Sequence, residues 1–259
     1  MKHVNVHWSI LSVLSLGAIG ITPAALEAQS TRVLVRVTAN DAKIIGSNVG
    51  GARITVRDAM SGDVLAEGVQ EGSTGDTDLI MGPHARGETV YDTEGAAGYV
   101  AELDIRRPTR VLIEAEGPLG SERGVQHAAK TLLVVPGVDI LGEGVILELN
   151  GFTVELLGPA PGAEVDVGEP FDIRARVTML CGCPTEPGGL WDSSAYRITA
   201  RALRDGEVVG EWPMEYAGTT SEFTASATLD AVGQFELQVI SIDTSKANAG
   251  IATGRVIVR

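Results

Sequence analysis

Residues Phe171 to Cys183 alternate strictly between apolar and polar side chains, a pattern typical of a β-strand with one buried face. The apolar side consists of Phe171, Ile173, Ala175, Val177, Met179, Cys181 and Cys183. Thirteen extended residues would span about 43 Å, which exceeds the usual length of a strand. We therefore expect the strand to bend or end before Cys183, where Pro184 follows. The two cysteines of the chain should then lie at the rim of a sandwich, on the same side as Met179.

Three interpretations of this sulfur cluster remain open. The first is a Cys181–Cys183 disulfide, because an exported protein meets an oxidising compartment. The second is a soft-metal site in which Met179, Cys181 and Cys183 bind Cu(I), with Met214 as a further thioether ligand. The third is a pair of free thiols beside a methionine that fills the core. Thiol–disulfide exchange would follow from the first interpretation, although no neighbouring cation is placed to lower a thiol pKa.

The N-terminus is typical of a secretory signal peptide over residues 1–28. Lys2 precedes an apolar run, Trp8 to Ile21, of only fourteen residues, and Pro23 then interrupts it. A membrane-spanning helix needs about 20 apolar residues, so this run is too short to be one. We expect cleavage close to Ala28, no transmembrane segment in the mature chain, and a secreted, periplasmic or cell-surface protein.

Composition limits the chemistry that the chain can carry. The net charge of −14 is spread evenly over both halves, which argues against nucleic acid as a partner because phosphate binding needs clustered Lys and Arg. After the signal peptide only His84 and His127 remain as histidines, and neither has a catalytic sequence context. Glu71, Asp76 and Asp78 are a weak candidate calcium site, because the chain has no Asp-x-Asp-x-Asp-Gly loop. We expect no catalytic residue and no cofactor other than copper.

The chain after residue 30 consists of short alternating segments separated by Gly, Pro, Asp and Asn, which predicts an all-β protein. Strands are expected at residues 33–37, 52–57, 64–66, 99–105, 110–115, 131–135, 145–149, 152–157, 171–183, 196–202, 207–209, 223–229, 230–239 and 251–258. Residues 70–98 hold few apolar side chains, and we expect them to form a long excursion outside the core. The spacing predicts two tandem β-sandwiches that meet near Asn150-Gly151 without a flexible linker, with Trp191 and Trp212 in core packing.

The first half, residues 31–150, resembles the transthyretin-like, carboxypeptidase-regulatory sandwich family. The resemblance rests on Gly51-Ala52-x-Ile54-x-Val56-x-Asp58, Gly62-x-Val64-Leu65-Ala66, Gly98-Tyr99-Val100-Ala101-Glu102-Leu103 and Val111-x-Ile113-x-Ala115-x-Gly117. Members of that family are mostly accessory modules without catalysis, so the resemblance implies a non-enzymatic role.

The second half, residues 151–259, resembles immunoglobulin-like and fibronectin type III-like domains. Asp230 to Val239 carries an Asp, a Gly and an aromatic residue before an alternating run, as the sixth strand of such domains does. The inter-sheet disulfide of antibody domains is missing, because both cysteines lie at one strand end.

These observations favour a non-catalytic exported protein that acts as an interaction or accessory module, with another exported or cell-surface protein as its partner. A periplasmic copper-binding protein is the alternative, and a thiol–disulfide exchange protein is the third hypothesis.

Overall fold

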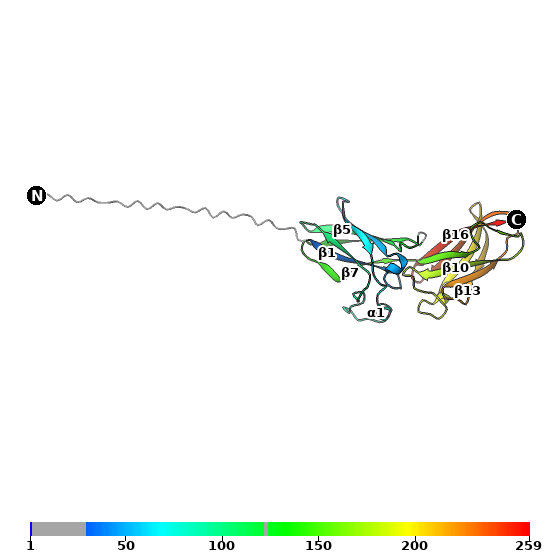
Figure 1. Cartoon of the computed structure of the whole chain (residues 1–259), viewed down its shortest axis with the longest axis horizontal. Coiled ribbons are helices and arrows are strands. Elements are labelled where there is room, and N and C mark those ends of the chain that lie inside the picture. Colours follow the sequence, from blue (N-terminus) through cyan, green and yellow to red (C-terminus); the bar gives the residue numbers. More distant parts are fainter. Residues whose placement is uncertain (2–29, 122–123) are drawn as a thin grey trace.

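The computed structural model describes Met1, residues 30–121 and residues 124–259 (Figure 1). The predicted signal peptide at residues 1–28 therefore lies almost entirely outside the described residues. The strands of the described residues form four β-sheets, two from residues 31–149 and two from residues 152–258. The protein is all-β and consists of two β-sandwiches in tandem, as the sequence predicts. No described helix is long and apolar enough to cross a membrane.

The N-terminal sandwich packs a three-stranded sheet against a four-stranded sheet. The three-stranded sheet has the order β4-β1-β7, from β4 (Tyr99–Leu103), β1 (Thr31–Ala39) and β7 (Ile140–Leu149). The four-stranded sheet has the order β3-β2-β5-β6, from β3 (Val64–Gln70), β2 (Ala52–Asp58), β5 (Thr109–Gly117) and β6 (Gln126–Val134). β1 runs antiparallel to β4 and parallel to β7. The transthyretin-like assignment of this half stays a prediction.

Alternation decides which side chains fill this first sandwich. Val33, Val35 and Val37 on β1 are completely buried, and so are Ile54 on β2 and Ile113 on β5. Because successive side chains of a strand point to opposite faces, the intervening residues of these strands point away from this core.

Residues 70–98 differ from the expectation of an excursion without a core. This segment includes α1 (Thr77–Met81), and Ile80, Val90 and Ala97 form a small cluster of buried side chains with Ile44. Gln70 is also completely buried, and its Nε2 donates hydrogen bonds to the carbonyl oxygens of Val37 (3.0 Å) and Ile45 (2.7 Å). The prediction failed because a handful of apolar residues, spread over nearly thirty positions, become a core only when the chain folds back on itself.

The C-terminal sandwich has an immunoglobulin-like arrangement of strands. One sheet has the order β13-β14-β10-β8, from β13 (Glu215–Tyr216), β14 (Glu222–Ala227), β10 (Phe171–Met179) and β8 (Phe152–Gly158). The other has the order β12-β11-β15-β16-β9, from β12 (Glu207–Pro213), β11 (Arg197–Arg204), β15 (Gly233–Asp243), β16 (Asn248–Val258) and β9 (Ala163–Val165). Labelled in chain order, these sheets match the A-B-E-D and G-F-C-C′ sheets of immunoglobulin domains. β15 occupies the place of the sixth strand, where the sequence predicts it.

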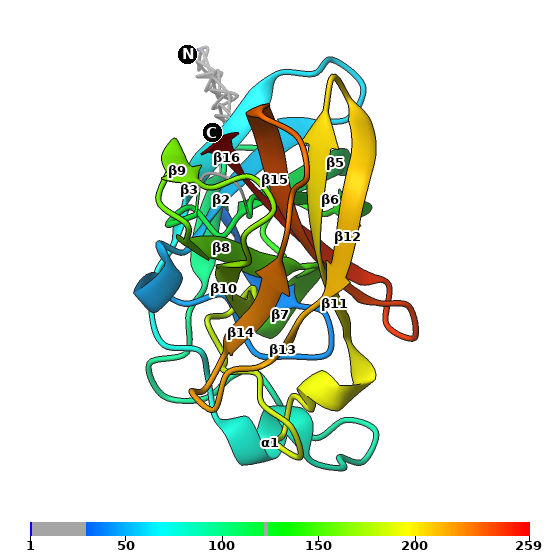
Figure 2. The same cartoon turned by 90° about the vertical axis from the view of Figure 1, so that its right-hand side faces the viewer.

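The two sandwiches follow one another end to end along the long axis of the molecule (Figure 1), and Figure 2 looks down that axis from the side of the C-terminal sandwich. Only Asn150 and Gly151 separate β7 from β8. One continuous cluster of buried apolar side chains includes residues from both sandwiches, among them Ala42 and Ile45 from the first and Leu180 and Trp191 from the second. The place where the sandwiches meet, called the junction below, is therefore part of the hydrophobic core.

Candidate functional site

The two cysteines lie in a tight turn at the junction. β10 ends at Met179, and the main-chain nitrogen of Met179 bonds to the carbonyl oxygen of Cys183 (3.0 Å) while Gly182 N donates to Met179 O (2.9 Å). Gly182 adopts the left-handed region with φ +77°, as expected for a three-residue hairpin loop that closes with a glycine. Within this turn Cys181 and Cys183 form a disulfide with a Cα–Cα distance of 5.4 Å. The strand thus ends before Cys183, and the pair lies at the sandwich rim, as predicted.

The rim position does not expose the sulfurs, because the N-terminal sandwich covers them. Cys181 is 0% exposed and Cys183 is 5% exposed. Asn48, in the short 3-10 helix η1 (Ser47–Val49), donates from Nδ2 to the carbonyl oxygen of Cys181 at 3.0 Å. A Cβ atom placed on Gly182 would lie 2.8 Å from Val49 Cγ1. The turn and the loop before β2 are therefore in close contact, which the sequence alone did not indicate.

A second loop of the C-terminal sandwich reaches the same surface through Trp191. Thr185 anchors the start of this loop: its main-chain N–H donates to Ser221 Oγ (3.1 Å), and its Oγ1 donates to the carbonyl oxygen of Val177 (2.6 Å). Asp192 accepts hydrogen bonds from main-chain nitrogens of Gly188 and Ser194, which hold the pKa of its carboxyl group below the usual value. The loop is thereby ordered on both sides of Trp191.

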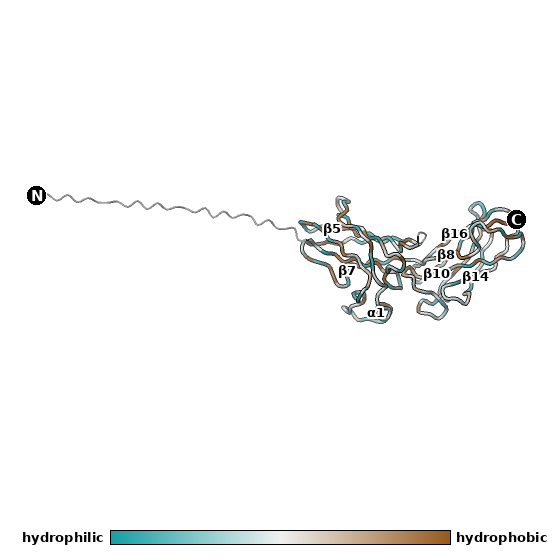
Figure 3. Tube along the Cα trace, viewed as in Figure 1, coloured by the Kyte–Doolittle hydropathy of each residue, from teal (hydrophilic) through white to brown (hydrophobic). Residues whose placement is uncertain are grey.

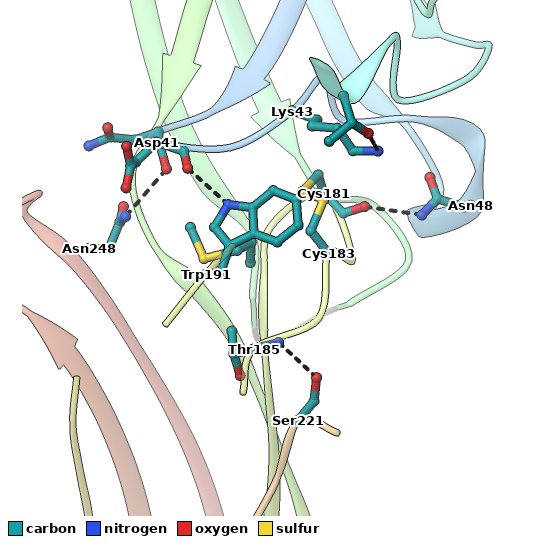
Figure 4. Close-up of a disulfide and its surroundings, with 12 residues drawn as sticks. Asp41, Lys43, Asn48, Cys181, Cys183, Thr185, Trp191, Ser221 and Asn248 are labelled. Carbon is teal, nitrogen blue, oxygen red and sulfur yellow. Dashed lines mark hydrogen bonds between the residues drawn. A yellow bond between two sulfur atoms is a disulfide. The ribbon is translucent and has the colours of Figure 1, made fainter. Parts of the chain in front are cut away.

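Trp191 crosses the junction. Its side chain is largely buried, and its indole Nε1 donates to the carbonyl oxygen of Asp41 at 3.0 Å (Figure 4). The carboxylate of Asp41 also pairs with Lys246 Nζ at 2.8 Å, and this pairing raises the pKa of Lys246. Both partners of that ion pair are partly exposed, so it contributes little to stability by itself. The buried indole is the stronger contact of the two.

Asn248, at the start of β16, bonds both to the connection between the sandwiches and to the N-terminal sandwich. It is 1% exposed, its Oδ1 accepts from Gly151 N (2.8 Å), and its Nδ2 donates to the carbonyl oxygen of Asn40 (3.3 Å). Nearby, Asn40 Nδ2 donates to the carbonyl oxygen of Lys246 at 2.6 Å. Buried polar groups are costly unless they are hydrogen-bonded, so these contacts hold the junction in one arrangement.

Met179 and Tyr196 complete the buried surroundings of the turn. Met179 is 1% exposed, and its Sδ lies 3.9 Å from the hydroxyl of Tyr196, which is directed at it as a donor. The ring of Tyr196 packs against that of Phe152 with centroids 4.8 Å apart. Burial, followed by the nearby carboxylates of Asp243 and Asp41, raises the pKa of Tyr196 to about 12. Met214, the other predicted thioether, is also buried.

In this buried arrangement the Cys181–Cys183 disulfide acts as a structural cross-link. Thiol–disulfide exchange requires an attacking thiolate to reach a sulfur atom, and the folded junction shields both of them. A Cu(I) site would need both sulfurs as thiolates, whereas here they are bonded to each other. Copper binding by Met179, Cys181 and Cys183 therefore stays a prediction for the reduced chain. Among the described residues, no group of three or more His, Cys, Asp or Glu side chains could hold a metal ion.

The remaining candidate residues have separate local roles. Asp76 accepts from Leu79 N (3.0 Å) and caps α1, so its carboxylate serves the helix. His84 is exposed in the loop after α1, with Nδ1 3.3 Å from Gly82 O. His127 lies on β6 opposite Glu116 of β5. The structure does not bring the two histidines and the carboxylates of Glu71 and Asp78 together into one site.

The polar residues that build the junction had no signature in the sequence. Asp41, Asn48 and Asn248 are ordinary turn-forming residue types next to strand ends. The only hint was the short connection at Asn150-Gly151, which leaves the two sandwiches no room to separate.

Comparison with known proteins adds little to this description. No protein-family model matches the chain, and no curated protein matches its sequence. Among solved structures, an engineered protein is 17% identical with a TM-score of 0.32, over 49% of this chain and 24% of its own length. The fibronectin(III)-like modules of Clostridium thermocellum CbhA are 14% identical with a TM-score of 0.29, over 88% of this chain and 90% of theirs. Domains 4 and 5 of the S-layer protein SbsC are 13% identical with a TM-score of 0.26, over 61% of this chain and 69% of theirs. Similarities this low carry no argument about function, and the strand order itself defines the immunoglobulin-like architecture of the second sandwich.

Proposed function

We propose that this chain is an exported, non-catalytic accessory module in which two β-sandwiches act as one rigid unit that holds its two ends at a fixed distance and orientation. The observation that carries the proposal is the buried junction. Asn48, Trp191 and Asn248 each make a hydrogen bond from one sandwich to the other, and the hydrophobic core passes between the sandwiches. Flexible tandem domains are usually joined by exposed, polar linkers with few contacts across them.

Rigidity has a functional value for a protein that presents surfaces to a partner. A fixed arrangement removes the entropic cost of ordering two domains when a partner binds both. The disulfide supports this role, because it fixes the turn that receives Asn48. We expect the partner to be another exported or cell-surface protein, in keeping with the predicted signal peptide.

Distance measurement between the sandwiches tests the rigid unit. Nitroxide labels at the exposed positions Glu102 on β4 and Glu207 on β12 would report the inter-sandwich distance by pulsed electron resonance. We expect a single narrow distribution in the wild type and a broader one in an Asn48→Ala/Trp191→Ala variant. Equal, broad distributions in both proteins would contradict the proposal. The matched control, Gln238→Ala/Arg255→Ala on the outer face of β15 and β16, should keep the narrow distribution.

Export is tested separately. The full chain is produced in a bacterial host, the cell compartments are separated, and the N-terminus of the purified protein is sequenced. The expected result is a protein outside the cytoplasm whose N-terminus lies close to residue 29. A cytoplasmic protein that retains Lys2 would remove export from the proposal while leaving the rigid unit in place.

A further inference from the structure

Exposed apolar side chains gather at the end of the N-terminal sandwich that points away from the junction. This end, called the distal tip, comprises residues 31–32, 59–64, 104–110 and 133–141. Its six large exposed apolar side chains are between 42% and 87% exposed and are Met60, Val64, Leu133, Val135, Val138 and Leu141. Single exposed apolar residues are normal, whereas a group of them at one end of a protein indicates a surface that binds a partner or a membrane.

Strand pairing brings these segments to one end. Arg110 at the start of β5 lies opposite Leu133 near the end of β6, and its carbonyl oxygen accepts from Ala59 N (2.9 Å) in the β2–β3 hairpin. Thr31 begins β1 at the same end, where its Oγ1 accepts from Gly137 N at 2.9 Å in the β6–β7 turn. The hairpin tips therefore surround the start of β1. In Figure 3 several hydrophobic stretches of the trace reach this end of the molecule.

The charge of the distal tip differs from that of the rest of the protein. It carries four arginines and three aspartates, a net charge of +1, although the whole chain has a net charge of −14. Arg32 forms an ion pair with Asp139. Arg106, Arg107 and Arg110 are exposed, and no ion pair is seen for them among the described residues. Three available guanidinium groups beside exposed aliphatic side chains are suited to a surface that presents both anionic and apolar groups.

The position of the chain's N-terminal end identifies that surface. The apolar run Trp8 to Ile21 precedes β1, and only nine residues separate Ile21 from Thr31. Nine residues reach at most about 30 Å when fully extended. With residues 1–28 acting as the predicted signal peptide, the distal tip is the part of the folded chain tethered nearest to the membrane during export. The opposite end of the molecule, beyond β16, lies on the far side of the C-terminal sandwich (Figure 1).

We infer that the distal tip docks on an anionic phospholipid surface. Arg106, Arg107 and Arg110 bind lipid phosphates, since guanidinium groups match phosphate oxygens in geometry and charge. The aliphatic side chains of the hairpins, led by Met60 and Leu133, enter the boundary between headgroups and acyl chains. Docking places the long axis of the rigid unit away from the membrane and directs the C-terminal sandwich outward. This inference goes beyond the proposed function and rests on its export part, which the N-terminal sequencing tests separately; the rigid junction does not depend on lipid.

Vesicle sedimentation tests the inference with the mature chain from residue 29 onward, which contains every described strand. The probes are vesicles of phosphatidylcholine alone and vesicles containing phosphatidylglycerol, each at low and at physiological salt. We expect preferential binding to the anionic vesicles that weakens with salt. Each arginine near an anionic surface contributes about five-fold in affinity, so Arg106→Gln/Arg107→Gln/Arg110→Gln should weaken binding at least about tenfold. Leu133→Ser/Val138→Ser should weaken binding to both kinds of vesicle.

The control variant Arg86→Gln/Arg197→Gln/Arg255→Gln removes the same charge from exposed positions outside the distal tip and should bind as the wild type does. Every protein compared begins at residue 29, so the apolar N-terminal run is absent and adds no affinity for lipid of its own. Circular dichroism and thermal unfolding confirm that the variants fold. Equal binding to neutral and anionic vesicles, or an equal loss in the control, would overturn the inference. A concentration-dependent dimer that the Leu133→Ser/Val138→Ser variant abolishes, without lipid binding in the wild type, would assign the tip to a second copy and also overturn it.

Discussion

The indole Nε1 of Trp191 donates a hydrogen bond to the carbonyl oxygen of Asp41, although 150 positions of sequence separate the two residues. Trp191 lies in a loop of the second sandwich and Asp41 follows β1 of the first, so this bond joins the two halves of the chain. Because the indole is also buried, it combines a directional contact with a large apolar one.

Replacing Trp191 with Phe keeps an aromatic ring in the junction and removes its donor. We expect the free energy of unfolding to fall by about 1–3 kcal/mol, because the carbonyl oxygen of Asp41 loses its partner. Urea unfolding followed by far-UV circular dichroism measures the change. The matched variant, Trp212→Phe on the edge strand β12, should cost less because that side chain is only partly buried. Equal losses in the two variants would show that the Trp191 hydrogen bond is not important.

Gly182→Ala tests the close approach of the sulfur turn to the N-terminal sandwich. The new methyl group would lie 2.8 Å from Val49 Cγ1 and 3.0 Å from Asn48 Nδ2, on a backbone with φ +77°. Gly188→Ala provides the control, because Gly188 has φ +72° and nothing within 4 Å of its Cβ position. Left-handed strain costs both variants about 1–2 kcal/mol. We expect Gly182→Ala to lose at least about 1 kcal/mol more in thermal or urea unfolding, and equal losses would contradict the close contact.

Protection of the disulfide follows from its burial under the first sandwich. Incubation of the native protein with a small dithiol, followed by alkylation and mass measurement, should leave Cys181 and Cys183 unlabelled. The same treatment in denaturant should add two alkyl groups, because exchange requires access to a sulfur atom. An Asn48→Ala/Trp191→Ala variant should be reduced faster in native buffer. Rapid labelling of the native wild type would mean that the junction opens readily.

The raised pKa of Tyr196 predicts that the folded protein loses stability at alkaline pH. Its pKa rises from the ordinary value of 10.0 to about 12 in the folded protein, chiefly through burial. Below pH 10 the phenol is neutral in both states and its contribution is complete. Between pH 10 and 12 the unfolded chain ionises while the folded chain does not, so stability falls as pH rises.

The variant Tyr196→Phe should flatten this fall, and the highest-pH step should disappear from the tyrosine absorbance titration at about 295 nm. Tyr91 and Tyr99 also have raised pKa values, so a smaller slope remains. Tyr216→Phe serves as the control at an exposed position. If the highest-pH step persists in Tyr196→Phe, another tyrosine is responsible for it.

Much of the fold could be predicted from local patterns. Alternation located all the long strands, and the Asp230–Val239 motif correctly marked β15. The two shortest strands, β9 and β13, were missed, because three and two residues are too few to show a period. Gln70 was placed outside the core, yet it is fully buried. Its side-chain amide can be buried because it hydrogen-bonds to main-chain atoms of Val37 and Ile45.

Part of the candidate site could also be predicted from local patterns. The sequence located Met179, Cys181 and Cys183 at one strand end, and the strand does end there. It could not choose between a disulfide, a metal site and free thiols, because that depends on the distance between two sulfur atoms across a turn. Asn48, whose contact with Cys181 spans 133 positions, could not be found by any local rule.

By itself the sequence determined an all-β chain with sandwich spacing and a sulfur pair at the end of a buried strand, because period-two alternation and turn residues act over a few positions. Only the tertiary structure decided that the sulfur turn faces the other sandwich and that the two cores merge. It also decided that the arginines and aliphatic residues of four separate segments meet at the distal tip. Those outcomes depend on strand pairing and docking between residues far apart in the chain, and local patterning leaves such contacts undetermined.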